Sequence, residues 1–249
     1  VMNLSKSSNN DNFAENQYNK MVNTPVSKLI TGLAIPTVIS MLVTSIYNMA
    51  DTFFVSQIST QASAAVGVVF PIMSIIQAFG FTLGMGSGSL ISIRLGQKRN
   101  EEANVIVSTA FFTAIGIGFL ITILGIIFST QFLSLVGASN TILPYAQDYA
   151  KYIFFGAPIM TASFVLNNVL RSEGKALFSM IGLTSGGILN IILDPIMIFG
   201  LCGFPKLGVV GAAIATVISR FVEMCIVFIY THVKIKKFVF LQNAYKGDK

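Results

Sequence analysis

Long apolar runs separated by short polar or charged segments are the main pattern of the sequence. No Asp, Glu, Lys or Arg occurs from Thr52 to Ile93, and none occurs from Ala103 to Gln147. A helix that crosses a bilayer needs about 20 apolar residues, and a charge at the bilayer centre is costly, so runs of this length predict membrane spans. The first run is too long for one span, and the polar stretch 56–61 divides it between two.

Six transmembrane helices are predicted in this way, over about 29–55, 62–93, 103–129, 146–170, 176–200 and 208–233. An amphipathic connector that ends at Leu143-Pro144 precedes the fourth of them. The predicted fold class is an all-α membrane protein, a six-transmembrane-helix bundle. We expect a flexible cytoplasmic N-terminal tail over 1–27, the six-helix transmembrane lobe over 28–237, and a cytoplasmic linker over 238–249.

The Lys and Arg residues favour one orientation of these helices. If the N-terminal tail is cytoplasmic, 13 of the 16 Lys and Arg residues lie on the cytoplasmic side, and Lys206 is clearly outside. Basic residues concentrate in the cytoplasmic loops of membrane proteins, so we expect a multi-pass protein of the cell membrane with both termini in the cytoplasm. The same bias accounts for the net charge of +6, and nucleic acid is therefore not an expected partner.

The composition narrows the class of protein further. Hydrophobic residues make up 53% of the chain and charged residues 10%, whereas soluble globular domains have roughly 25% charged residues. A soluble enzyme, a secreted mini-protein and a disordered chain are therefore excluded. Cys202 and Cys225 have no metal-site spacing, and no H-E-x-x-H, G-x-S-x-G or paired-Cys motif occurs, so we expect neither an enzyme nor a bound cofactor.

Four ionisable residues lie in the predicted spans where they cannot readily reach the lipid headgroups, namely Asp51, Asp194, Arg220 and Glu223. Ionisable residues inside spans mark functional sites by default. The i, i+3 spacing of Arg220 and Glu223 also fits an ion pair that neutralises itself between helices. A cavity site and a structural ion pair therefore both stay open for these two residues.

Asp194 belongs to the segment 190–195 (NIILDP), in which Asn190 and Asp194 lie four residues apart on one helix face. Pro195 cannot donate a hydrogen bond to the carbonyl of Ile191, which leaves that oxygen available one turn away. A carboxylate, an amide oxygen and a carbonyl oxygen make a site for a proton or for a small hard cation such as Na+.

The first predicted helix repeats this spacing. Tyr47 and Asp51 are four residues apart, Asn48 follows Tyr47, and Pro36 lies about four turns before Asp51 as an expected kink. If the helices 29–55 and 176–200 face each other, Asp51 and Asp194 share one pocket. Burial and mutual repulsion then favour the uptake of a proton or Na+ by the two carboxylates.

Gly80, Gly84 and Gly88 recur every four residues in the helix 62–93 and form a ridge of small residues. Such a ridge lets another helix approach closely. The pattern Gly84-x-Gly86-x-Gly88 does not predict a phosphate-binding loop, because it lies within a span and no strand precedes it.

The order and spacing of several segments resemble the multidrug and toxic compound extrusion (MATE) transporters, over nearly the whole chain after the tail. The short cytoplasmic loops and the Y-N-x-x-D helix are most similar to the bacterial and archaeal branch that includes the MepA-type and DinF-type pumps. The resemblance rests on Pro36 with 47–55 (YNMADTFFV), 65–67 (AVG) with Pro71, 94–97 (RLGQ) with 101–103 (EEA), 170–175 (LRSEGK), 190–194 (NIILD) and 208–216 (GVVGAAIAT).

The resemblance implies secondary active efflux of cationic amphipathic small molecules in exchange for inward H+ or Na+. It implies that the coupling ion binds within the N-terminal six-helix lobe, at Tyr47, Asp51, Asn190 and Asp194, with Na+ held by the last three. The expected bending points are Pro36 and Pro195, and the other candidate cavity residues are Arg220, Glu223, Asn48 and Thr216. The chain departs from the family at 211–213 (GAA), where a hydroxyl is frequent, and offers Thr216 a turn later.

Members of this family pack two six-helix lobes about a pseudo-two-fold axis, and this chain has the length of one lobe. The resemblance therefore implies the N-terminal half of a transporter, with a second six-helix lobe and the lipid bilayer as partners and 238–249 as the linker to the missing lobe. A natural half-size protein that dimerises is the alternative. Two other functions stay open: a flippase for lipid-linked saccharide precursors, which calls for a more cationic cavity, and the membrane subunit of an ATP-driven exporter, which calls for a long cytoplasmic coupling segment.

Overall fold

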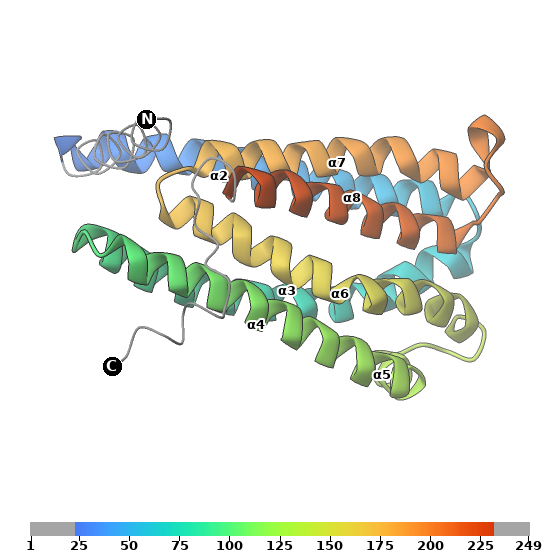
Figure 1. The fold of residues 1–249 in the computed structure, drawn as a ribbon. Helices are drawn as coiled ribbons and strands as arrows, with labels where there is room; N and C mark the ends of the chain where they lie inside the picture. The colour runs from blue at the N-terminus through green and yellow to red at the C-terminus, as the bar shows by residue number, and fades with distance from the viewer. Residues whose placement is uncertain (1–22, 232–249) are drawn as a thin grey trace, which may run out of the picture.

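The computed structural model describes residues 23–231, and these residues form a bundle of helices with no strand among them (Figure 1). The elements are α2 (Val26–Ser56), α3 (Thr60–Gly96), α4 (Asn100–Ile127), α5 (Ser129–Val136), α6 (Leu143–Ser172), α7 (Ala176–Phe199), the short 3-10 helix η1 (Leu201–Gly203) and α8 (Val209–Ile229). All of them except α5 and η1, six helices, are long and apolar enough to cross a membrane. The predicted fold class and the six predicted spans are confirmed. The helix ends fall within three residues of the expected ones, except that the expected end of the last span, at 233, lies outside the described residues.

The predicted amphipathic connector corresponds to α5, which runs from Ser129 to Val136 and buries Leu133. Gly137 ends α5 in the left-handed conformation, with φ 106°. Residues with a Cβ adopt this conformation at a cost, so glycine is favoured at such a helix end. The chain then reaches α6, whose second residue is Pro144, a position where the missing N–H of proline would have had no helical partner.

Helix α6 lies at the centre of the bundle and has the most extensive burial of the helices. It packs against α3 and α4 on one side and against α8 on the other, while α2 packs mainly against α7, and α7 packs against α8 (Figure 1). Two groups of helices, α3 with α4 and α2 with α7 and α8, are therefore joined through α6. Most of α2 is exposed, including the apolar side chains of Met49 and Phe53.

The ridge of small residues on α3 faces α6. A Cβ added at Gly80 would lie 2.8 Å from Cβ of Phe164, and one added at Gly84 would lie 2.8 Å from Cβ of Asn168. Real Cβ atoms do not approach so closely, so a larger residue at either position would force the two helices apart. The ridge predicted from the sequence is therefore the contact surface between α3 and α6.

Short turns join α3 to α4 and α6 to α7, and both carry ion pairs. Glu102 bonds to Arg94 at 3.1 Å and to Arg99 at 2.8 Å, and Lys175 bonds to Glu173 at 3.0 Å. The predicted tail and linker lie almost wholly outside the described residues: only 23–27 of the tail are described, and 232–249 are not. Residues 26 and 27 form the start of α2.

Candidate functional site

Helix α2 buries only a narrow stripe, which is made of Ser40, Tyr47, Asp51 and Val55. Tyr47 and Asp51 follow each other at one helical turn, so the stripe holds both of them on the side that packs against α7. Asp51 is 7% exposed although the rest of its helix is largely exposed. Of the polar residues of α2 that the sequence singles out, Tyr47 and Asp51 therefore point into the bundle.

Asp51 meets α6 through Tyr149. The Tyr149 hydroxyl donates a hydrogen bond to Oδ2 of Asp51 at 3.3 Å, and Tyr149 is completely buried. The phenol also lies within electrostatic range of Asp194 and close to the hydroxyl of Thr216. Sequence reasoning missed Tyr149, because a phenol has no charge to mark it and charged residues, Asp148 and Lys151, lie beside it in the sequence.

Asp194 lies on α7 with no exposed surface. The side-chain amide of Asn190 donates to Oδ1 of Asp194 at 3.2 Å and lies 3.4 Å from the hydroxyl of Thr216 on α8. Asn190 and Asp194 thus lie on the same face of α7, as their i, i+4 spacing predicts. Thr216 on α8 lies beside the same amide group. Pro195 lies inside α7, where it cannot donate to the carbonyl of Ile191.

Asp51 and Asp194 interact electrostatically. Each has one carboxylate oxygen, Oδ1 of Asp51 and Oδ2 of Asp194, with no hydrogen-bond partner in the part of the chain that the structure describes. Oδ1 of Asn190 and Oγ of Ser219 are also buried and lack a partner among residues 23–231. A buried polar atom without a partner costs roughly 1–3 kcal/mol, so such a group of oxygens calls for a proton, a cation or water.

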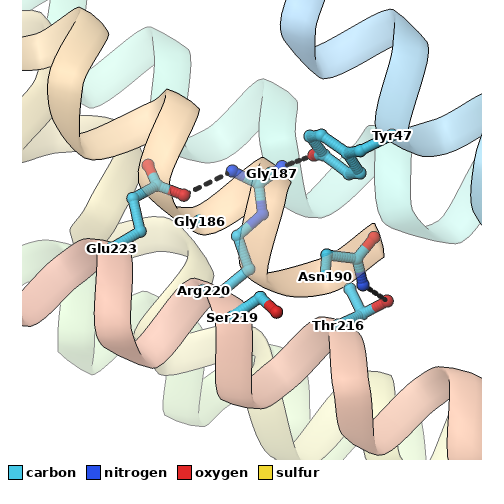
Figure 2. Close-up of a pocket in the computed structure, with 8 residues that line it drawn as sticks. All are labelled: Tyr47, Gly186, Gly187, Asn190, Thr216, Ser219, Arg220 and Glu223. Atoms are coloured by element: carbon cyan, nitrogen blue, oxygen red, sulfur yellow. Dashed lines mark hydrogen bonds and ion pairs between the residues drawn. The ribbon is translucent and has the colours of Figure 1, made fainter. Parts of the chain in front are cut away.

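A small pocket beside α8 includes Asn190 and Ser219 but neither Asp51 nor Asp194 among its lining residues, so one pocket shared by the two carboxylates stays a prediction (Figure 2). It is lined by Tyr47 on α2, Gly186, Gly187 and Asn190 on α7, and Thr216, Ser219, Arg220 and Glu223 on α8. Nη1 of Arg220 donates to Oε2 of Glu223 at 2.8 Å, and Nη2 donates to the hydroxyl of Tyr47. Arg220 and Glu223 therefore form an ion pair and also line the cavity, which unites the two interpretations that the sequence leaves open.

The remaining candidates lie at the edge of the site or away from it. Asn48 is half-buried and does not line the pocket. Pro36 lies inside α2, which is helical from Val26 to Ser56, so the bending at Pro36 and Pro195 stays a prediction. The described residues contain no group of three or more His, Cys, Asp and Glu side chains that could hold a metal ion.

The comparison with known protein families gives one clear match: the MatE family model covers residues 36–196. The chain belongs to the MATE family. The match includes α2 from Pro36 onward and extends to the Asn190-Asp194 pair on α7. The chain is therefore a multi-pass membrane protein of MATE type.

Curated relatives carry transport names. A FAD transporter of Shewanella oneidensis is 33% identical over 204 residues, which are 82% of this chain and 45% of that protein. The multidrug export protein MepA of Staphylococcus haemolyticus is 34% identical over 206 residues, again 82% of this chain and 45% of that protein. The chain thus spans about half the length of the curated relatives it matches, and these relatives are named as transport proteins, not as enzymes.

Solved structures of this MATE family agree with the fold. A MOP superfamily transporter from Pyrococcus furiosus is 33% identical and superimposes with a TM-score of 0.82 over 90% of this chain and 49% of that one. A multidrug resistance MATE family transporter in an outward-facing conformation gives the same TM-score of 0.82 at 33% identity, over 90% of this chain and 49% of that one. The arrangement of the six spans is therefore that of about half of a MATE transporter.

Proposed function

We propose that this chain forms the N-terminal lobe of a secondary active multidrug efflux transporter, which exchanges cationic amphipathic compounds for H+ or Na+. The observation that carries the proposal is the burial of Asp51 and Asp194 within electrostatic range of each other, each with one oxygen that lacks a partner in the described chain. The names of the MATE relatives, which include multidrug export proteins, support the same function.

The charges around the site favour a cation as its occupant. Among residues 23–231, Arg220 is the one arginine that lines the pocket, and it is paired with Glu223 at 2.8 Å. Arg171, which is half-buried and does not line the pocket, also interacts electrostatically with Glu223. No described ion pair neutralises Asp51 or Asp194. Two buried carboxylates within electrostatic range of each other and without a positive partner favour the uptake of a proton or a hard cation, and the oxygens of Asn190 and Thr216 suit Na+ as further ligands.

A central cavity for the drug requires a second lobe in addition to this one. Central cavities of secondary transporters lie between two repeats that rock against each other around the substrate. We therefore propose a second six-helix lobe as the partner, and the exposed apolar side chains of α2 and α3, such as Ile46, Met49 and Phe70, suit contact with it or with lipid. The predicted orientation, with both termini in the cytoplasm of a cell-membrane protein, belongs to the same proposal.

Coupling requires that the drug and the cation favour different conformations of the transporter. A ligand shifts a conformational equilibrium only by its difference in affinity for the two states. In the proposed cycle, cation uptake at Asp51 and Asp194 on the outer side weakens drug binding, and cation release on the inner side restores it. Pro36, inside α2, is the position where the helix lacks a backbone hydrogen bond and can bend.

The alternatives fit the charges less well. A flippase for lipid-linked saccharide precursors, or a carrier of an anion such as FAD, needs positive charge in its cavity, whereas the charge of Arg220 is cancelled by Glu223. The membrane subunit of an ATP-driven exporter needs a long coupling segment, whereas the turns after α3 and α6 are short. Cation-coupled efflux of cations therefore remains the function that the site supports best.

Transport assays with full-length protein in everted vesicles test the proposal. Asp51→Asn and Asp194→Asn should each abolish uptake of ethidium driven by an imposed H+ or Na+ gradient, because an amide cannot carry the coupling charge. Asp148→Asn is the matched control, since Asp148 is exposed on the same helix as Tyr149 and should leave transport unchanged. Undiminished transport in both site variants would remove the two carboxylates from the mechanism.

A further inference from the structure

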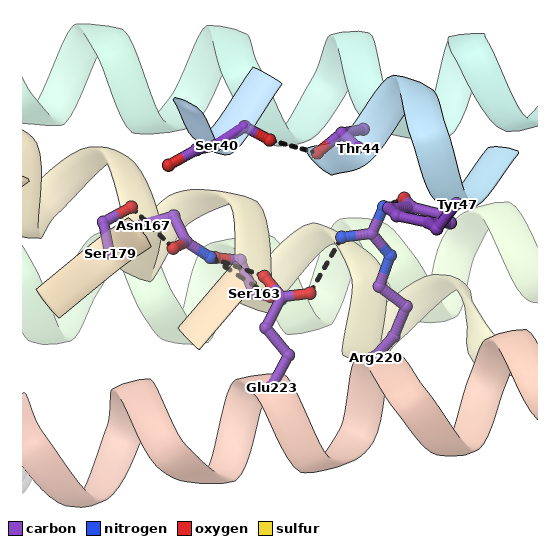
Figure 3. Close-up of polar contacts among 8 residues, drawn as sticks. All are labelled: Ser40, Thr44, Tyr47, Ser163, Asn167, Ser179, Arg220 and Glu223. Carbon is purple, nitrogen blue, oxygen red and sulfur yellow. Dashed lines mark hydrogen bonds and ion pairs between the residues drawn. The ribbon is translucent and has the colours of Figure 1, made fainter. Parts of the chain in front are cut away.

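A chain of buried polar side chains links four helices of the lobe and includes three residues that line the pocket, Tyr47, Arg220 and Glu223 (Figure 3). It runs from Tyr47 on α2 to Arg220 and Glu223 on α8, to Ser163 and Asn167 on α6, and to Ser179 on α7. Oε1 of Glu223 accepts hydrogen bonds from Ser163 at 2.9 Å and from Asn167 at 2.8 Å, and the Ser179 hydroxyl donates to Asn167 at 2.7 Å. Side chains of four helices are thus held in one network.

The guanidinium group of Arg220 is fixed on several sides. Arg220 is 4% exposed, and its guanidinium carbon lies 5.2 Å from the ring centroids of both Tyr47 and Phe164. A buried guanidinium is tolerated when it is paired with a carboxylate and placed over aromatic faces. Here one planar fork serves two partners, because Nη1 meets Glu223 and Nη2 meets the Tyr47 hydroxyl.

Helix α2 has few polar connections to the rest of the lobe. Its hydroxyl side chains, from Thr31 to Ser56, donate to carbonyls of α2 itself three or four residues earlier. Within residues 23–231, two side-chain hydrogen bonds join α2 to another helix: Tyr149 to Asp51, and Arg220 to Tyr47. One of them uses the carboxylate that is proposed to bind the cation, and the other does not.

Two glycines of α7 make room for this second connection. A Cβ on Gly187 would lie 3.2 Å from Cδ1 of Tyr47, and a Cβ on Gly186 would lie 3.0 Å from Cβ of Glu223. The absence of side chains at these positions lets α2 and α8 approach α7 closely on both sides. Arg220 can then span from α8 to α2 across the face of α7, as Figure 2 shows.

We propose that Arg220 is a positioning residue for the cation site: it fixes Tyr47, and thereby holds α2 so that Asp51, one turn further on, faces Tyr149 and Asp194. Glu223 supports this role, because it neutralises Arg220 and anchors it to α6 and α7 through Ser163 and Asn167. The bond between Tyr47 and Arg220 does not involve Asp51, so it holds α2 while the cation site exchanges its occupant. The part of this proposal that concerns cation binding rests on the proposed function, and the part that concerns α2 does not.

Hydrogen exchange measured by mass spectrometry on the full-length protein in nanodiscs tests the position of α2. Tyr47→Phe removes only the hydroxyl, and Arg220→Lys keeps the charge but loses the planar fork that reaches both partners. Loss of one hydrogen bond should raise exchange about fivefold to tenfold for amides of 44–56 on α2, with no change on α3 and α4. Thr52→Val is the matched control, since its hydroxyl bonds within α2 to the carbonyl of Asn48.

Either of two results overturns the proposal for α2. Unchanged exchange over 44–56 in both variants would mean that the bond does not hold the helix. A similar rise over all six long helices would mean that the variants loosen the whole lobe and that Arg220 has no specific effect on α2. Hydrogen exchange is measured without an ion gradient and without a drug, so both outcomes are independent of the proposed function.

A transport measurement tests the link to the cation site. In Arg220→Lys we expect the Na+ or H+ concentration for half-maximal ethidium transport to rise about fivefold, because the cation must then also order α2. A purely structural role would lower the amount of active protein and the maximal rate, and would leave the half-maximal concentration unchanged. An unchanged value would therefore overturn the positioning role at the cation site. Undiminished transport in both Asp51→Asn and Asp194→Asn would refute the proposed function and with it the part of this proposal that concerns cation binding, whereas the part that concerns α2 is decided by hydrogen exchange.

Discussion

Removing Glu223 is expected to be among the most damaging single changes in the lobe. Its carboxylate accepts hydrogen bonds from Ser163 at 2.9 Å, from Asn167 at 2.8 Å and from Arg220 at 2.8 Å, and the residue is 1% exposed. Glu223→Leu removes the acceptor of all three hydrogen bonds and leaves the guanidinium of Arg220 buried without a counter-charge. Breaking a buried ion pair on one side costs about 3–5 kcal/mol. The Ser163 hydroxyl loses its acceptor and adds to this loss, whereas the Asn167 amide keeps its bond to the carbonyl of Ser163 at 2.9 Å.

A double-mutant cycle separates the energy of the Arg220–Glu223 ion pair from the energy of the hydrogen bonds that the two residues make with their other partners. Arg220→Met should cost about 3–5 kcal/mol for the same reason, because it leaves Glu223 buried and unpaired. The double variant removes both charges together and should cost only about 1–3 kcal/mol, for the lost partners of Tyr47, Ser163 and Asn167. The coupling energy between the two positions is then at least about 3 kcal/mol, at the upper end of values for contacting residues.

The assay is equilibrium unfolding of the purified full-length protein in mixed micelles, followed by the helical circular dichroism signal. Glu101→Gln is the control, because Glu101 is exposed near the start of α4 and should change the unfolding free energy by less than about 0.5 kcal/mol. A loss below about 1 kcal/mol for Glu223→Leu would refute the reasoning. A double variant as unstable as the two single losses combined would refute it as well.

Two other changes probe the site and the packing around it. Tyr149→Phe should reduce ethidium transport at a limiting cation concentration about fivefold, because the hydroxyl that donates to Asp51 is lost. Tyr145→Phe, at an exposed position of the same helix, should not reduce it. Equal transport rates for the two variants would contradict the role of Tyr149. Gly80→Ala should lower the unfolding free energy by about 1–3 kcal/mol, because the new Cβ would lie 2.8 Å from Cβ of Phe164. Gly86→Ala should not lower it, because no atom lies within 4 Å of a Cβ at that position. Equal unfolding midpoints for the two variants would contradict the α3–α6 contact.

The spans could be predicted because each one depends on the pattern of residues within its own segment of the sequence. The absence of charges marks the helices, and the polar stretch 56–61 and the turns near 97–99 and 173–175 mark their ends. The pairing of Asn190 with Asp194 was also predictable, because an i, i+4 spacing places two side chains on one face whatever surrounds the helix. Such features depend on one helix alone.

The rest of the site depends on how separate helices turn toward each other. Tyr149 contacts Asp51, which is 98 positions away in sequence, and Arg220 contacts Tyr47, which is 173 positions away. No spacing rule within one helix connects such residues. Ser163 and Asn167 resemble ordinary small polar residues of a span, and their role appears only when Glu223 lies beside them.

Displacement of a cation by a drug tests most directly whether Asp51 and Asp194 share the coupling ion. Ethidium is added to the purified full-length protein in weak buffer, and released H+ is followed with a pH indicator and released Na+ with a radioactive tracer. We predict that the wild-type protein releases one of the two ions as the drug binds, and that the double variant Asp51→Asn, Asp194→Asn binds the drug and releases neither. Equal release by the double variant would contradict the account.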